Sequence, residues 1–147
     1  MKRSRRLQLV LDLVLREEEN EATRLGQALQ QMKAAEDKLR ELRDYLSGYH
    51  EELRQQVQRA STARGLQVYH EFIARLGVAI EHQQRLVEQT RVRLERQQAI
   101  WARIHAKRKN LEGFIARCAR EEEAVVEKKL QRVLDDAQAW RREISSE

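Results

Sequence analysis

The sequence predicts an all-α protein, a long antiparallel two-helix coiled-coil hairpin followed by an unpaired C-terminal helical extension. The 147-residue chain contains no proline, and one proline inside a helix costs about 3 kcal/mol. Charged residues make up 36% of the chain and aromatic residues 5%, which leaves too few large apolar groups for a thick globular core. Apolar residues recur at heptad spacing along most of the chain, as they do in coiled coils. We therefore expect residues 1–147 to form a single elongated helical domain.

The first predicted helix covers about residues 4–60. Its apolar residues form two heptad rows offset by three positions, the first made of Leu25, Met32, Leu39, Leu46, Leu53 and Ala60, and the second of Ala28, Ala35, Leu42 and Tyr49. Nearer the N-terminus, Glu18 and Glu21 interrupt these rows, which predicts looser pairing of the helices at that level.

The chain is expected to reverse direction in a short turn at residues 61–66. Ser61 and Thr62 have hydroxyl groups that can bond to their own backbone and compete with the helix. Gly65 can adopt a positive φ without steric cost, which suits a helix C-cap or a tight connection.

The second predicted helix covers about residues 66–143 and continues the heptad pattern. One row begins with Tyr69 and Leu76, carries Gln83, Thr90 and Gln97, and returns to Ile104, Leu111, Cys118 and Val125; the other contains Ile73, Ile80, Val87, Leu94 and Trp101. A new stripe then follows, made of Val126, Leu130, Val133, Ala137, Trp140 and Ile144. Folding the chain about residue 63 places residue 4 opposite about residue 122, so this last stripe has no partner within the hairpin and favours an external one.

The charge distribution favours acidic partners, because the net charge is +5 and residues 85–120 hold ten of the basic residues against three glutamates. Nucleic-acid binding is the least favoured use of this charge, since Trp101 lies on the heptad row rather than free to stack on bases. The apolar start of the chain superficially resembles a signal peptide, but Gln8 and Asp12 interrupt it. No apolar run approaches the ~20 residues of a membrane span, so the cytoplasm is the expected compartment. Cys118 is the single cysteine, which excludes an intrachain disulfide.

No pattern of catalytic or metal-binding residues is present in the sequence. The four histidines lack the spacing of a metal site, and there is neither a glycine-rich phosphate loop nor a serine elbow. We therefore expect a protein that is not an enzyme and binds no cofactor.

Large apolar side chains cluster beside the predicted turn. Tyr45 flanks the heptad rows and shares a helix face with Leu42 and Tyr49. Folding about the turn brings Phe72, Leu76 and Ala79 to the same level. Two helices cannot bury all six residues, so part of this cluster should stay exposed as a binding surface. The alternative is a broad helix interface that buries its own flanks.

At these residues the sequence resembles the flagellar FliJ family, the small coiled-coil component of the flagellar type III export apparatus. The resemblance covers nearly the whole chain. It rests on the N-terminal Leu7, on Leu39, Leu42, Asp44, Tyr45 and Tyr49 before the turn, on Tyr69, Phe72, Ile73, Leu76, Ala79 and Ile80 after it, and on Trp101 and Lys107-Arg108-Lys109.

The resemblance implies a hairpin that connects the export ATPase ring to the membrane-embedded export gate and also binds export chaperones, in the cytoplasm at the inner membrane. The gate-contacting positions of the family correspond to Leu42, Tyr45, Tyr49, Phe72, Leu76 and Ala79. Lys38 and Gln83 stand where the family has a glutamine and a histidine. For the ATPase ring, the candidates are the basic arm Arg3, Arg5 and Arg6 and the apolar residues Val126, Leu130, Val133 and Trp140. A generic cytoplasmic coiled-coil adaptor is the alternative, and a basic nucleic-acid-binding helix is a more distant one.

Overall fold

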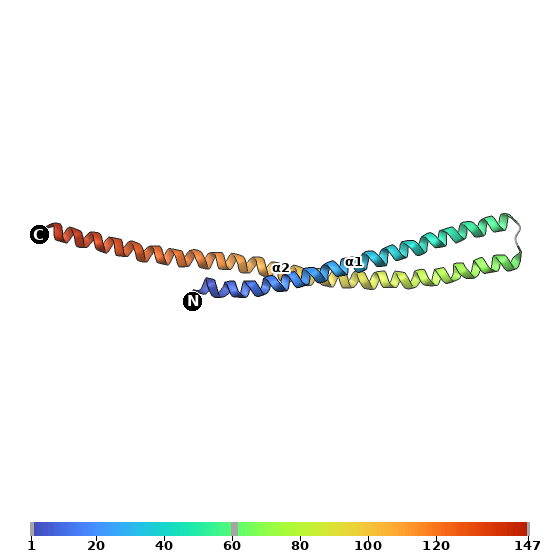
Figure 1. Ribbon diagram of the computed structural model, residues 1–147, viewed down its shortest axis with the longest axis horizontal. Coiled ribbons are helices and arrows are strands. Elements are labelled where there is room, and N and C mark those ends of the chain that lie inside the picture. Colours follow the sequence, from blue (N-terminus) through green and yellow to red (C-terminus); the bar gives the residue numbers. More distant parts are fainter. Residues whose placement is uncertain (1, 60–61, 147) are drawn as a thin grey trace. The chain divides into compact units, whose positions relative to one another are not determined.

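Two long α-helices packed against each other make up the computed structural model, which describes residues 2–59 and 62–146 (Figure 1). Helix α1 spans Arg3–Gln58 and helix α2 spans Ala63–Ser146. The described residues contain no β-strand, so the all-α prediction is confirmed. Two residues assigned to the end of the first helix and to the turn, Ala60 and Ser61, lie outside the described residues.

Helix α2 begins at Ala63, three residues before the expected boundary. Thr62 provides the reason, because its Oγ1 accepts a hydrogen bond of 3.2 Å from the backbone N–H of Gly65. This is the bond of a helix N-cap, which satisfies an N–H group that has no partner within the helix. The Leu66 N–H then donates to the Thr62 carbonyl at 3.1 Å. Gly65 thus lies in the first turn of α2 with an ordinary negative φ, and the predicted glycine cap with positive φ is wrong.

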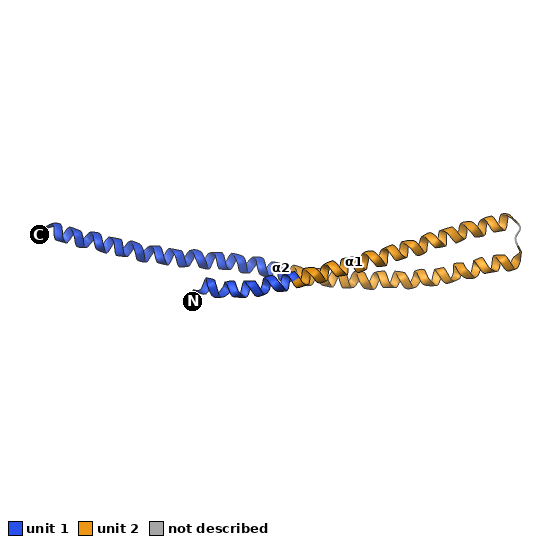
Figure 2. Ribbon diagram, in the orientation of Figure 1, with its two compact units in different colours: residues 1–19, 103–147 blue, residues 20–102 orange. Residues whose placement is uncertain are grey.

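The chain divides into two compact units, and each contains a segment of both helices (Figure 2). Unit 1 combines residues 1–19 and 103–147, and unit 2 consists of residues 20–102.

In unit 2 the two helices lie side by side and run in opposite directions (Figure 1). Ala35, Leu39 and Ile80 form its buried apolar core. Polar groups also lie in this interface: the Gln83 side chain is buried, and its Nε2 donates to the Ala35 carbonyl at 2.9 Å. Unit 2 is therefore held together by alternating apolar and polar contacts along one narrow interface.

In unit 1 the start of α1 packs against α2, with Leu11, Val14 and Cys118 buried. Ser4 Oγ donates a 2.6 Å hydrogen bond to the Glu122 carboxylate, and the Ser4 N–H donates to the same group at 3.1 Å. This contact matches the expected pairing of residue 4 with about residue 122. From residue 123 to residue 146 every described residue of α2 is exposed.

The looser pairing expected near Glu18 and Glu21 is not observed, because both carboxylates find polar partners on α2. Within unit 2, Glu21 is 8% exposed and accepts hydrogen bonds from the Gln97 side chain to its carboxylate and its carbonyl. Within unit 1, Glu18 is bound by His105 and Arg108. Acidic residues in a helix interface need not separate the helices when donors lie opposite them.

Candidate partner-binding surfaces

The residues expected to bind the export gate belong to unit 2, near the end of α1 and the start of α2 (Figure 1). The structure brings two of them into direct contact across the helix pair. The rings of Tyr49 and Phe72 stack with centroids 5.7 Å apart and an interplanar angle of 5°. The Arg75 guanidinium lies over the Phe72 ring at 5.9 Å from its centroid.

The same six residues divide into a half-buried and an exposed group. Leu42, Tyr49, Leu76 and Ala79 are half-buried, whereas Tyr45 is 52% exposed and Phe72 is 45% exposed. The expectation that two helices leave part of the cluster exposed is therefore confirmed for Tyr45 and Phe72. Tyr45 donates a 3.3 Å hydrogen bond to Glu41. A shallow groove beside it is lined by Asp44, Tyr45, Gly48, Tyr49 and Glu52.

We name these six residues (Leu42, Tyr45, Tyr49, Phe72, Leu76 and Ala79) the turn-end patch. Its two exposed rings are large and rigid, and aromatic side chains of this kind contribute much of the binding energy at protein interfaces. The Tyr49–Phe72 stack holds one of them in a defined orientation before any partner binds, which lowers the entropic cost of binding.

The second candidate set lies in unit 1. Arg3, Arg5 and Arg6 are exposed in the first turns of α1, and Val126, Leu130, Val133 and Trp140 are exposed along α2. The structure places Arg3 and Val126 on one groove of about 350 Å³, lined also by Lys2, Cys118, Glu121, Glu122 and Val125. Arg5 and Arg6 follow along α1, and Leu130, Val133 and Trp140 lie farther along α2.

Arg3 also has a contact that the sequence did not suggest. Its guanidinium lies 5.1 Å from the centroid of Phe114, and the Arg117 guanidinium lies 5.8 Å from the same centroid. Cation–π contacts of this kind attract a cation to the ring face. Phe114 thus attracts the side chain of Arg3 at the start of α1.

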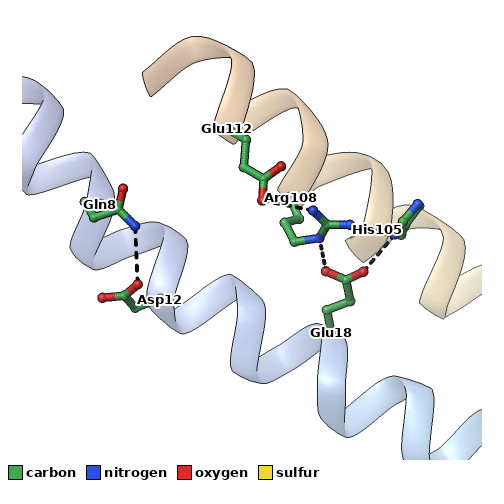
Figure 3. Close-up of polar contacts among 6 residues, drawn as sticks. All are labelled: Gln8, Asp12, Glu18, His105, Arg108 and Glu112. Atoms are coloured by element: carbon green, nitrogen blue, oxygen red, sulfur yellow. Dashed lines mark hydrogen bonds and ion pairs between the residues drawn. The ribbon is translucent and has the colours of Figure 1, made fainter. Parts of the chain in front are cut away.

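The heptad pattern also did not predict a cluster of polar groups in unit 1 (Figure 3). Glu18 accepts a 2.7 Å contact from His105 Nδ1 and a hydrogen bond from Arg108 Nε, and Arg108 reaches Glu112 at 2.9 Å. Hydrogen bonding from His105, with a further contribution from Arg108, lowers the pKa of Glu18. Glu18 and Arg108 are expected to keep their charges at neutral pH and to hold the two helix segments of this unit together.

The described part of the chain shows no group of three or more His, Cys, Asp or Glu side chains that could hold a metal ion. Nor does any of its helices combine the length and apolar character needed to cross a membrane. The fold is a pair of long α-helices with large apolar side chains exposed in each of its two units.

Comparison with known families identifies the type of protein. The family model of the flagellar FliJ protein matches residues 2–145, so the chain belongs to the flagellar FliJ protein family. It is therefore a non-catalytic flagellar component related to protein export. No curated protein and no solved structure gives a significant match to the chain.

Proposed function

We propose that this chain couples the flagellar export ATPase ring to the membrane-embedded export gate, as a cytoplasmic antiparallel coiled coil with a C-terminal helical extension. Export chaperones are its third class of partner. The family match supports a role in export. The observation that carries the coupling role is that each unit of the chain presents a separate surface with exposed large apolar residues.

In this proposal the turn-end patch binds the cytoplasmic part of the export gate. Tyr45 and Phe72 are its anchors, because they combine large area with partial exposure. The half-buried residues Leu42, Leu76 and Ala79 shape the surface around them. Phe72 stacks on Tyr49, and a large aromatic ring held in place by a neighbour has the character of a binding hot spot.

The test is binding of the purified chain to the purified cytoplasmic domain of the gate protein. The double variant Tyr45→Ala/Phe72→Ala is expected to weaken binding by about 30-fold or more, as truncation of hot-spot residues does. Val78→Ala is the control, because Val78 is 66% exposed, lies on α2 like Phe72 and is outside the patch. Circular dichroism of each variant must show an unchanged helical fold. Equal binding by the double variant and the control would overturn the assignment.

The basic arm and the exposed residues of α2 form the proposed contact with the ATPase ring. Arg5 and Arg6 are exposed and suit an acidic partner surface. The variant Arg5→Glu/Arg6→Glu should weaken ATPase binding most at low salt, because exposed charges are screened at high salt. Binding that ignores both the substitution and the salt concentration would remove the arm from this contact.

The two alternative functions make different predictions. A generic coiled-coil adaptor would bind neither the gate nor the ATPase. A nucleic-acid binder would need free charge in residues 85–120, but two arginines of this run are paired within the chain. Arg91 forms ion pairs with Glu88 and Glu95, and Arg108 forms ion pairs with Glu18 and Glu112. These pairs reduce the basic charge available to phosphates.

A further inference from the structure

The last part of α2 carries an apolar stripe without a partner among the described residues. Its members alternate at spacings of four and three residues, and all of them are exposed: Val126, Leu130, Val133, Ala137, Trp140 and Ile144. Trp140 is 65% exposed and Leu130 is 58% exposed. Ser4 near the start of α1 binds Glu122, and Arg3 shares a groove with Val126, the first residue of the stripe. From Leu130 onward every residue of the stripe is exposed. Exposing such an apolar helix face to water is unfavourable in free energy, and packing against a second helix would bury it.

The positions of the apolar residues in this stripe are symmetric about residue 135. Val126 and Ile144 are equidistant from this centre. Leu130 and Trp140 form a second equidistant pair, and Val133 and Ala137 a third, as the printed sequence shows. Two copies laid antiparallel across this centre would therefore place every apolar residue of one stripe against an apolar residue of the other.

In an antiparallel coiled coil the residues that flank the stripe on one side pair with each other, offset from the apolar pairs, so that these flanking pairs are centred on residues 134 and 136. In the antiparallel arrangement Glu127 of one copy faces Arg141 of the second, and Lys129 faces Glu143. Each of these pairs occurs twice in a symmetric dimer. At the centre Leu134 faces its own counterpart, which adds an apolar contact. The one unfavourable pair is Asp136 with Asp136 of the second copy.

We propose that residues 123–146 of α2 bind the same segment of a second copy in an antiparallel coiled coil. Charge complementarity selects this direction. In a parallel pair the flanking positions would place Glu127 beside Glu122 and Asp136 beside Arg141 of the second copy, so a repulsive contact offsets the attractive one. Like charges at such positions are destabilising.

A groove in unit 1 adds room for the second copy. It is lined by Cys118, Val125 and Val126 among others and has a volume of about 350 Å³. In the antiparallel register Ile144 of the second copy lies opposite Val126 and thus at the edge of this groove. The interface contains only about three heptads, so the dimer is expected to be weak and to depend on protein concentration.

This self-association goes beyond the proposed coupling function and uses residues assigned there to the ATPase ring. Val126, Leu130, Val133 and Trp140 cannot contact a second copy and the ATPase at once. The dimer is thus an ATPase-free state of the protein. Its test requires the purified chain alone, so its failure is distinct from failure of the proposed function.

The first test is sedimentation equilibrium of the full chain over the micromolar concentration range. Glu127→Arg should weaken the dimer about tenfold or more, because two attractive pairs become repulsive. Adding Arg141→Glu to the same chain should restore the dimer, since the pairs then have reversed but opposite charges. Arg142→Glu is the matched control on the outer face of the helix and should leave the dimer unchanged. Asp136→Asn should tighten it.

Two results would overturn the proposal. One is a chain that stays monomeric over the whole range even with Asp136→Asn. The other is a double reversal that fails to restore association lost in Glu127→Arg. Circular dichroism of each variant verifies that the helices remain folded, so a loss of association cannot come from unfolding.

The second test uses thiol cross-linking in a Cys118→Ala background to determine whether the helices of the two copies run antiparallel or parallel. A mixture of Glu127→Cys and Arg141→Cys chains should cross-link to each other, because these positions face each other in the antiparallel dimer. Each variant alone should cross-link little, since its own thiols lie about 20 Å apart along the helices at 1.5 Å per residue. Cross-linking of each variant to itself, with no product in the mixture that joins a Glu127→Cys chain to an Arg141→Cys chain, would refute the antiparallel register.

Discussion

Replacing Gln83 with leucine is expected to stabilise unit 2. Gln83 is 9% exposed and donates to the Ala35 carbonyl at 2.9 Å. That carbonyl lies within α1, where it already accepts the regular bond of the helix from Leu39, so Gln83→Leu leaves no buried acceptor unsatisfied. The lost hydrogen bond is worth about 0.5–1.5 kcal/mol. Burying a leucine side chain contributes about 1.5–3 kcal/mol.

The balance is a gain in unfolding free energy of about 1 kcal/mol, or about 2–4 °C in Tm for a chain of this size. The groove beside Gln83, lined also by Ala34, Ala35 and Leu86, has room for the new side chain. Urea unfolding followed by circular dichroism measures the difference. Gln83→Ala is the control and should lose about 1–2 kcal/mol, because it removes the hydrogen bond without refilling the space. A Gln83→Leu chain less stable than the wild type would show that the hydrogen bond outweighs apolar burial here, which would refute the reasoning.

Three further variants test other parts of the structure. Leu39→Ala should lower the unfolding free energy by about 2–5 kcal/mol in the same urea assay, because Leu39 is buried in the core of unit 2. A loss no larger than that of Val78→Ala, at an exposed position, would contradict the core position of Leu39. Thr62→Ala should cost about 1 kcal/mol, since it removes the cap on the Gly65 N–H, and Thr62→Ser should retain most of it. Glu18→Gln should destabilise the chain at neutral pH, because the lowered pKa of Glu18 reflects a stabilised carboxylate whose contribution is fully present above its ordinary value of 4.5. That contribution is lost as the pH falls through the still lower pKa of Glu18 in the folded state. Thermal melts should therefore show the difference in Tm between variant and wild type shrinking below pH 4.5. A difference in Tm that does not change with pH would contradict the ion pair.

Much of the helix pair was predictable because its main determinants are local. The lack of proline and the heptad rows specify two helices and the inward face of each. The exposure of Tyr45 and Phe72 followed from the same reasoning, since a pair of helices has only two inward faces. Their use as a binding site for the export gate stays a prediction.

The sequence by itself therefore determined the helices, their buried faces and the pairing of residue 4 with about residue 122. Only the tertiary structure decided which polar side chains meet across the interface. Glu18 appeared as an interruption of the heptad rows until the structure placed His105 and Arg108 beside it. The physical reason is that heptad periodicity arises along one helix, whereas contacts between helices depend on their axial register, and that register is set by packing over the whole length of each unit.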